Sequence, residues 1–281
     1  MSLLFFSLLS GCAQDELTQS WQLDRTRILA AQAEPPEIRP GENVQFTSLV
    51  FSPESIESVV WFACLPESST SFGCDIDPSL LEGMDGENPD FNALIEAGFA
   101  GSEPMLPPSW TAPEDALDNL NTSQRIEGLS ALVTLTAIPS NATEESDIEV
   151  AYKRFPISES PTPNNNPSIL EMRIDDTPYA PEEVFVATER ESYTIEPIMA
   201  EDAVETYNFI NREGVTEERV EEPYFTWYTE GGAFDQPFSL HPYNSVVWTA
   251  PSAPFSGRII VTLRDRRGGI AWSWLRIEVR P

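Results

Sequence analysis

The sequence predicts an all-β protein made of two tandem β-sandwiches, and three observations carry this prediction. Short segments rich in Val, Ile, Thr and aromatic residues are separated by turn residues about every 8–12 positions, which is typical of sandwich folds. One group of segments occurs twice in the same order. Signals for helices are few, so neither a helical bundle nor an alternating α/β fold is indicated.

The repeated group centres on a Trp-Thr-Ala-Pro motif at 110–113 and again at 248–251. An aromatic strand precedes each motif, and a strongly alternating β run follows it. The order and content of the two copies match, which indicates a tandem duplication. Trp61 and Trp227 lie in the two aromatic strands, where a sandwich of this type keeps its central core tryptophan.

The repeat places domain one at 21–155 and domain two at 169–281. Residues 156–168 between them contain four prolines and three asparagines, a composition that disfavours helix or strand interiors. We therefore expect a semi-rigid linker that sets the reach of domain two. The strands expected at the start of each domain lie at 27–33, 44–51, 169–174, 184–187, 193–198 and 204–210.

Residues 66–107 have no comparable counterpart in the second copy, so they are predicted to be an insertion into domain one. Within it, Asn88 and Pro89 form a helix start, Leu94 and Ile95 an apolar stripe, and Gly98 a stop. The first sandwich is thus expected to carry a partly helical insertion.

The first twelve residues combine an apolar run at 3–9 with Ser10, Gly11 and Cys12. This run is far shorter than the roughly 20 residues of a spanning helix, and it fits a secretory signal peptide. The segment 9–12 resembles a bacterial lipobox. That resemblance implies a signal peptide at 1–11, lipid on Cys12, a tether at 12–20 and, from Ala13, retention at the outer membrane. An ordinary secretory peptide is the alternative.

Two further cysteines, Cys64 and Cys74, form an even pair in a chain expected to be exported, which predicts a disulfide. Closing so short a loop would stabilise the fold by ~2–3 kcal/mol. Two thiols without a nearby histidine are too few ligands for zinc.

The pattern as a whole resembles immunoglobulin-like modules of bacterial surface lipoproteins. The resemblance rests on residues 27–30, on 34–35, on 40–42, on both Trp-Thr-Ala-Pro motifs and on Arg-Asp-Arg-Arg-Gly-Gly at 264–269 before Trp272. It implies two immunoglobulin-like sandwiches, with 264–269 as the turn of the last hairpin. Two glycines in that turn would supply positive φ angles. In domain one, residues 141–145 replace this turn.

Composition limits the possible functions. The chain has 46 acidic and 16 basic residues, a formal charge of -30 and 41% hydrophobic residues. Real cores are therefore possible, whereas nucleic-acid binding is not expected because the surface repels phosphate. No nucleophile elbow, zinc-protease helix or phosphate loop is present, and His241 is the only histidine. We expect no enzyme activity and no cofactor.

A calcium site is a weaker possibility in the insertion. Asp75, Asp77, Asp85 and Asp90 concentrate carboxylates there, but without the ordered spacing of an EF-hand loop. A solvated acidic loop with helix caps explains the same residues. No metal is therefore expected.

Two features of the C-terminal region could bind a partner. The strand phase of 270–280 places Trp272 and Trp274 outward, where they could stack on sugars or protein, unless a β-bulge turns both rings into the core. Arg264, Arg266 and Arg267 at the last turn could contact an acidic partner or anionic glycan, or else pair with acid of domain two.

Together these observations predict a lipid-anchored cell-envelope protein that acts as a non-catalytic binding or structural module for an unidentified envelope protein or glycan. A carbohydrate-binding module using the aromatics of domain two is the alternative. An envelope hydrolase ranks third, because acidic pairs are too common in this composition to single out a catalytic one.

Overall fold

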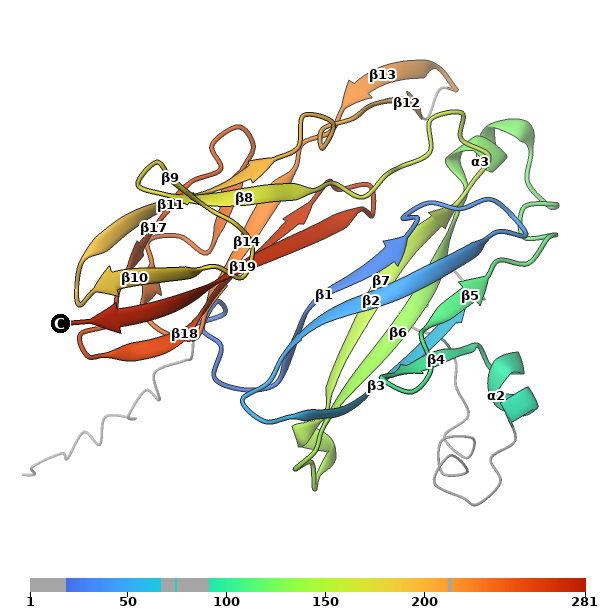
Figure 1. Ribbon diagram of the computed structural model, residues 1–281. Helices are drawn as coiled ribbons and strands as arrows, with labels where there is room; N and C mark the ends of the chain where they lie inside the picture. The colour runs from blue at the N-terminus through green and yellow to red at the C-terminus, as the bar shows by residue number, and fades with distance from the viewer. Residues whose placement is uncertain (1–18, 67–73, 75–90, 212–213) are drawn as a thin grey trace, which may run out of the picture.

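The computed structural model describes residues 19–66, 74, 91–211 and 214–281. These residues form two β-sandwiches that lie side by side in Figure 1, domain 1 in blue and green and domain 2 in yellow to red. The prediction of an all-β protein with two tandem immunoglobulin-like sandwiches is confirmed.

Domain 1 packs a three-stranded sheet of order β1-β2-β5 against a four-stranded sheet of order β4-β3-β6-β7. Its strands are β1 Arg27–Glu34, β2 Asn43–Phe51, β3 Ile56–Cys64, β4 Phe99–Glu103, β5 Ser109–Thr111, β6 Leu129–Pro139 and β7 Glu149–Ile157. Its helices are α2 Phe91–Glu96, α3 Thr122–Glu127 and the 3-10 turn η1 Glu145–Asp147.

Domain 2 packs two five-stranded sheets, of order β15-β17-β11-β8-β9 and β10-β19-β18-β14-β16, and adds the hairpin β12-β13. Its strands are β8 Ile169–Ile174, β9 Thr177–Tyr179, β10 Val184–Thr188, β11 Ser192–Met199, β12 Thr206–Ile210, β13 Thr216–Val220, β14 Tyr224–Thr229, β15 Ala233–Phe234, β16 Phe238–Leu240, β17 Val246–Thr249, β18 Phe255–Arg264 and β19 Ile270–Arg280.

The two domains share one connectivity, as expected for a duplication. The order β1-β2-β5 corresponds to β8-β11-β17, and β4-β3-β6-β7 corresponds to β16-β14-β18-β19. In both domains a parallel contact joins the segment after the first strand to the last strand, through Ile38 and Ile157 in domain 1 and through β10 and β19 in domain 2. This is the closure that immunoglobulin-like sandwiches use.

Each core is built around the predicted tryptophan. Trp61 and Trp227 are fully buried on the equivalent strands β3 and β14. Trp61 stacks on Phe46 at a centroid distance of 5.5 Å, and Trp227 donates its indole N–H to Ser239 at 3.2 Å. Since alternate residues of these strands point to opposite faces, the aromatic runs seen in the sequence bury one set of rings in each core.

The part of the expected insertion that the structure describes packs on the outer face of the four-stranded sheet. The disulfide Cys64–Cys74 is present, with the two Cα atoms 5.7 Å apart. Helix α2 occurs where the helix signals predicted it, and Leu94 packs with Phe62 and Phe99 against this face. Residues 99–103 form strand β4, which pairs with β3. The end of the segment that we expected to be an insertion is therefore part of the sandwich.

Helix α3 was not predicted from the sequence. Helix α3 begins with a capping box, in which Asn121 accepts from the backbone N–H of Gln124 and the Gln124 side chain accepts from that of Asn121, each at 3.1 Å. The Asn-x-x-Gln pattern was the available signal. Within the described residues, no helix is long and apolar enough to cross a membrane.

Candidate interaction surface at the domain junction

The predicted linker is packed against both domains and is not a solvated spacer. Ser158, Ser160 and Asn164 are each less than 10% exposed. The Asn166 side chain donates to Ala33 O of β1 at 2.7 Å and accepts from Ile270 N of β19 at 2.9 Å. Composition suggested a semi-rigid spacer, but the Asn164 and Asn166 side chains bond to groups more than a hundred residues away in sequence.

The chain before domain 1 also joins the two domains. Leu23 N donates to Thr229 O at 2.9 Å, and Thr229 N donates to Trp21 O at 3.0 Å. Trp21 packs edge-on against Phe234 of domain 2, with ring centroids 5.9 Å apart. The predicted tether at 12–20 therefore leads into a segment held by domain 2, although the chain goes on to build domain 1.

An apolar cluster fills the space between the sandwiches. Domain 1 and its leading segment contribute Leu23, Leu29 and Phe51, and the outer face of the β10-β19-β18-β14-β16 sheet contributes Tyr228 and Ile260. Each of these residues is less than 10% exposed. Part of the outer sheet face of domain 2 is thus covered by domain 1.

The turn at 264–269 joins β18 to β19, as the resemblance implied, and Asp265 shapes it. One Asp265 oxygen accepts from the backbone N–H groups of Arg267, Gly268 and Gly269 at 2.7, 3.0 and 3.0 Å. The positive φ angles lie at Arg266 and Gly268, at 72° and 117°, and not at both glycines as expected. At Gly269 the absence of a side chain lets the Asp265 carboxylate approach the backbone closely, because a Cβ there would lie 2.0 Å from Asp265.

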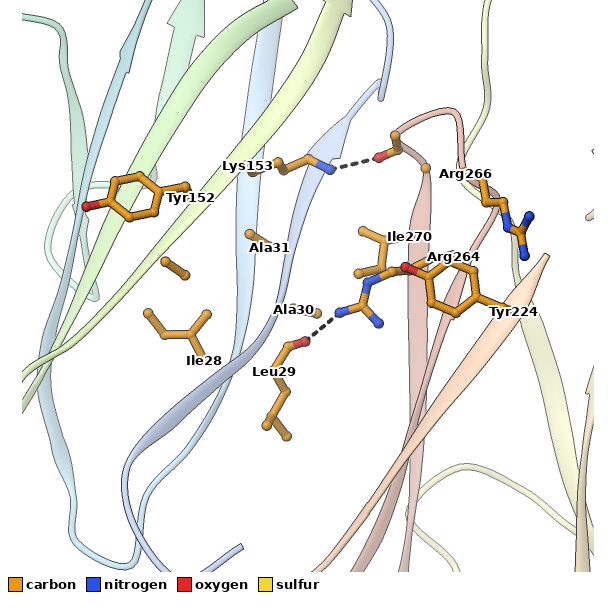
Figure 2. A pocket seen from close by; sticks show the side chains of 13 residues that line it. Ile28, Leu29, Ala30, Ala31, Tyr152, Lys153, Tyr224, Arg264, Arg266 and Ile270 are labelled. Atoms are coloured by element: carbon orange, nitrogen blue, oxygen red, sulfur yellow. Dashed lines mark hydrogen bonds between the residues drawn. The ribbon is translucent and has the colours of Figure 1, made fainter. Parts of the chain in front are cut away.

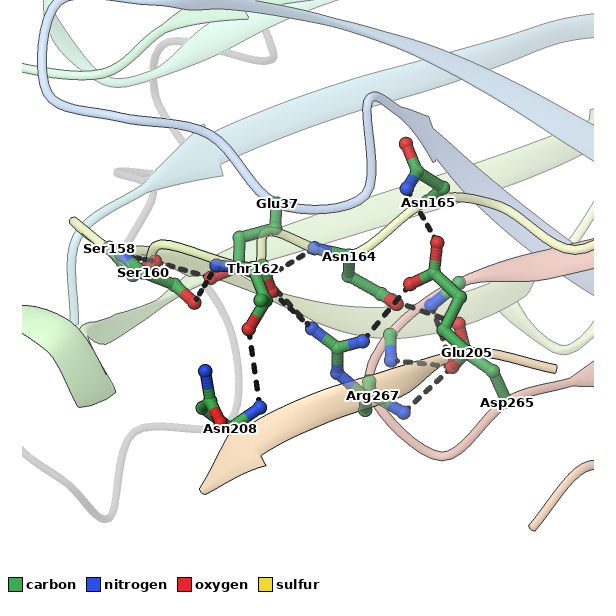
Figure 3. A network of polar contacts seen from close by, with 12 residues as sticks. Glu37, Ser158, Ser160, Thr162, Asn164, Asn165, Glu205, Asn208, Asp265 and Arg267 are labelled. Atoms are coloured by element: carbon green, nitrogen blue, oxygen red, sulfur yellow. Dashed lines mark hydrogen bonds and ion pairs between the residues drawn. The ribbon is translucent and has the colours of Figure 1, made fainter. Parts of the chain in front are cut away.

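Arg267 is the centre of a polar group that we call the junction cluster. It is formed by Arg267, Glu37, Asn164, Glu205 and Asp265, which Figure 3 labels, together with Glu221. Its guanidinium lies 3.0 Å from Glu221, 3.1 Å from Glu205 and 3.5 Å from Glu37, and it donates to Thr162 O at 3.0 Å. The cluster therefore ties domain 2 to domain 1 and to the linker.

Burial changes the acidity of the junction cluster. Desolvation raises the pKa of the Asp265 carboxyl, although Asn164 and three backbone N–H groups bond to it. Desolvation likewise raises the pKa of Glu221, against the opposing effect of Arg267. Both carboxyls hold their protons more tightly than ordinary surface acids do.

The three arginines predicted as a binding surface divide between two environments. Arg267 is only 14% exposed and is paired within the chain, so it is not available to a partner. Arg266 is half exposed and pairs loosely with Glu222 at 3.2 Å. Arg264 donates to Thr262 at 2.6 Å and to Leu29 O at 2.9 Å. Two of the three arginines, Arg266 and Arg267, thus pair with acidic residues of the same chain.

Trp272 and Trp274 point outward, as the strand phase predicts, because β18 and β19 pair without a bulge from Phe255 to Arg264. Both rings are nevertheless partly buried. Trp274 packs against the apolar cluster between the domains and lies 5.9 Å from the Arg258 guanidinium. The two rings therefore do not form an open platform for sugars.

Lys153 was not singled out by the sequence, although it is the only lysine of the chain. It lies on β7 and donates to Gly268 O of the β18–β19 turn at 2.7 Å. Desolvation lowers the pKa of Lys153 to about 8. The signal that could have found it is this rarity: one lysine in a strand that otherwise alternates towards a sandwich core.

The remaining residues named from the sequence lie away from the domain junction or outside the described residues. His241 is exposed in the loop after β16. Cys12 and the aspartates Asp75, Asp77, Asp85 and Asp90 all fall outside the described residues, so both predictions stand untested. In the described part of the chain, no group of three or more His, Cys, Asp or Glu residues could hold a metal ion.

No protein-family model matches the chain, and no curated protein matches its sequence. Among solved structures, fibronectin(III)-like modules of Clostridium thermocellum CbhA are 10% identical, over 91% of this chain and 94% of theirs, with a TM-score of 0.23. Murine CEACAM1b is 9% identical over 91% and 100%, with a TM-score of 0.24.

The tandem V-type regions of VCBP3, a v-region-containing chitin binding protein, are 10% identical over 91% and 100%, with a TM-score of 0.29. At such identities and scores, these likenesses concern the sandwich fold and nothing about function.

Proposed function

We propose that this chain is a lipid-anchored cell-envelope protein whose two sandwiches act together as a non-catalytic binding and structural module. The observation that carries the proposal is the junction. The leading segment, β1, the linker and the last hairpin all cross between the domains, and they bring an apolar cluster and a buried ion cluster with them. Such a junction makes a rigid body, which suits holding a partner in a fixed geometry.

The junction also orients the molecule on the membrane. Lipid on Cys12 would be followed by a short tether, and Trp21 is held against Phe234 of domain 2. A fully extended chain from Cys12 to Trp21 spans about 30 Å. Domain 2 is thereby kept near the membrane, and domain 1 is carried by its contacts with domain 2 and not by the tether.

One exposed feature of domain 2, its apolar sheet edge, supports a binding role. β16 is the edge strand of its sheet, and it carries Phe238 and Leu240 on the outer face, with Tyr243 just beyond it. Their exposed fractions are 54%, 45% and 82%. Several large apolar side chains gathered at one sheet edge are typical of interaction sites.

A photo-cross-linking experiment in intact cells tests the proposal. A photo-reactive residue at Tyr243 is compared with one at Val215, which is similarly exposed in the β12–β13 hairpin. We expect one discrete adduct from position 243 and none from 215. Amine-reactive reagents are unsuitable, because Lys153 is the only lysine and already bonds to Gly268 O.

Cys12→Ala is the matched control for the anchor. It should release the protein from the membrane fraction and reduce the adduct at position 243. Retention of the Cys12→Ala protein at the membrane would contradict lipid anchoring. Absence of any adduct from position 243 in the wild-type background would contradict the binding role.

A further inference from the structure

A groove runs along the junction between the two domains (Figure 2). Its volume is about 390 Å³. Residues 28–31 of β1 form its floor, with two small side chains, Ala30 and Ala31. One wall is 151–153 of β7. The other is Tyr224 of β14 together with Arg264, Arg266 and 268–270 of the last hairpin. We call this the junction groove.

The charge of the junction groove is opposite to that of the protein. Lys153, Arg264 and Arg266 line it, and no acidic residue of the described chain does. The chain as a whole has nearly three acids for every base. A concave site of one charge sign on a surface of the other concentrates the field and attracts oppositely charged groups.

The donors of the junction groove are already held in position. Lys153 uses one N–H on Gly268 O, and an ammonium group carries three. Arg264 is oriented by its bonds to Thr262 and Leu29 O. The Tyr224 hydroxyl points from the opposite wall into the groove (Figure 2). An anion binding here would meet fixed cations and would not have to order flexible ones.

An apolar strip adjoins the junction groove. Tyr224 faces Leu240 across the β14–β16 pair, and Thr226 faces Phe238, all on the outer face of the sheet. Leu240 and Phe238 are about half exposed, and Tyr243 follows them at the sheet edge. Side chains directly opposite each other on adjacent strands lie about 5 Å apart. The strip therefore continues from the Tyr224 wall of the groove.

We propose that the junction groove and the adjoining strip bind a peptide segment of a partner protein in which a carboxylate stands next to apolar side chains. The carboxylate meets Lys153, Arg264 and the Tyr224 hydroxyl, and the apolar side chains cover Leu240 and Phe238. This assignment rests on the proposed binding function and names its site and ligand chemistry. An acidic sugar would satisfy the groove but would leave the apolar strip uncovered.

The single lysine gives a direct readout. Growth on lysine labelled with ¹³C at Cε marks a single side chain, Lys153, in the full chain carrying Cys12→Ala. We would titrate it with short peptides that combine Glu with Leu and Phe, with the same peptides carrying Gln for Glu, and with oligogalacturonate. We expect a saturable shift of the Lys153 signal with the acidic peptides, and at least about tenfold weaker binding of the Gln peptides.

Two variants and two matched controls locate the site. Lys153→Gln removes a cation of the groove, and Leu240→Asn removes an exposed apolar contact without touching a core. Each change should weaken binding of the acidic peptide about tenfold, as measured by the dissociation constant from calorimetry. The same kinds of change at Arg280 and Leu170, both exposed and outside the groove, should leave binding unchanged.

Three results would overturn the inference: equal binding of Glu and Gln peptides, equal or tighter binding of oligogalacturonate, or no shift of Lys153 with any peptide. The proposed function fails separately. If position 243 still cross-links a partner while Lys153→Gln and Leu240→Asn have no effect, the binding role stands and the groove is not its site. If the peptides bind but no adduct forms in cells, the groove is a peptide-binding site and the proposed function in cells is contradicted.

Discussion

The β18–β19 turn has two sides that differ in the charge around them. On one side Arg267 lies among Glu37, Glu205 and Glu221 and is almost fully buried. On the other side Arg264 and Lys153 line a groove without acid. We call the side of Arg267 the closed side, because its guanidinium is paired with acids of the same chain, and the side of Arg264 and Lys153 the open side, because these cations line the junction groove. Adjacent arginines in a sequence can therefore have opposite roles, one structural and one available to a ligand.

The largest effect is expected on the closed side, with Arg267→Ala. This change leaves Glu37 and Glu221 buried without their cation, and removing one partner of a buried ion pair costs about 3–5 kcal/mol. Urea unfolding measures the loss. Arg266→Ala is the neighbouring control, expected within about 0.5 kcal/mol because Arg266 and Glu222 are both well exposed. Equal losses from the two variants would contradict the contrast between the sides.

A smaller loss is expected from Gly269→Ala, within the turn itself. The new Cβ would overlap Asp265 and lie 2.9 Å from the backbone oxygen of Asn165, so the turn must shift. Overpacking of this kind costs about 1–3 kcal/mol. Gly214→Ala is the comparison, since no atom lies within 4 Å of its Cβ position and only the positive φ opposes the change. A larger loss at Gly214 would show that Asp265 does not constrain the turn.

Mild acid should stabilise the closed side. Because the pKa values of Glu221 and Asp265 are raised in the folded state, folded protein binds protons more tightly than unfolded chain. The contribution of Glu221 and Asp265 to the free energy of unfolding should therefore increase as the pH falls from 7 towards the ordinary carboxyl range near 4. The cost of Arg267→Ala should shrink over the same interval, since protonated carboxyls no longer need the cation. A cost of Arg267→Ala that stays constant or grows between pH 7 and pH 4 would contradict this.

The smallest effect concerns Lys153 on the open side. Its folded pKa of about 8 is below the ordinary value near 10.4, so folded protein holds this proton more weakly than unfolded chain. Stability should rise modestly as the pH increases from 8 to about 10, and Lys153→Gln should remove that slope. The ¹³Cε signal of Lys153 gives the pKa of its ammonium group directly, and the same signal in urea should titrate in the ordinary range.

The sandwiches could be predicted from the sequence because their signals are local. Alternating strands, one buried tryptophan per core and a helix ending at Gly98 each depend on neighbours in the chain. The pairing of Cys64 with Cys74 followed from the cysteine count once Cys12 was set aside and the chain was expected to be exported. Duplication strengthened the assignment of the strands and of the core tryptophans, because each of these was made twice.

The junction could not be predicted because its contacts are distant in sequence. Asn166 reads as a linker residue, and nothing near it reveals its bonds to Ala33 and Ile270. One clue was available: Leu49 and Phe51 occupy the strand phase opposite to Val44 and Phe46, so β2 is apolar on both faces near its end. That second face packs between the domains.

The central claim is that the two sandwiches form one rigid body through their junction. ¹⁵N relaxation of the full chain carrying Cys12→Ala tests it most directly, because it gives a rotational correlation time for each domain. We predict a single time for both domains, and two shorter, unequal times in the Arg267→Ala protein. Independent tumbling of the two domains in the unsubstituted junction would contradict the account.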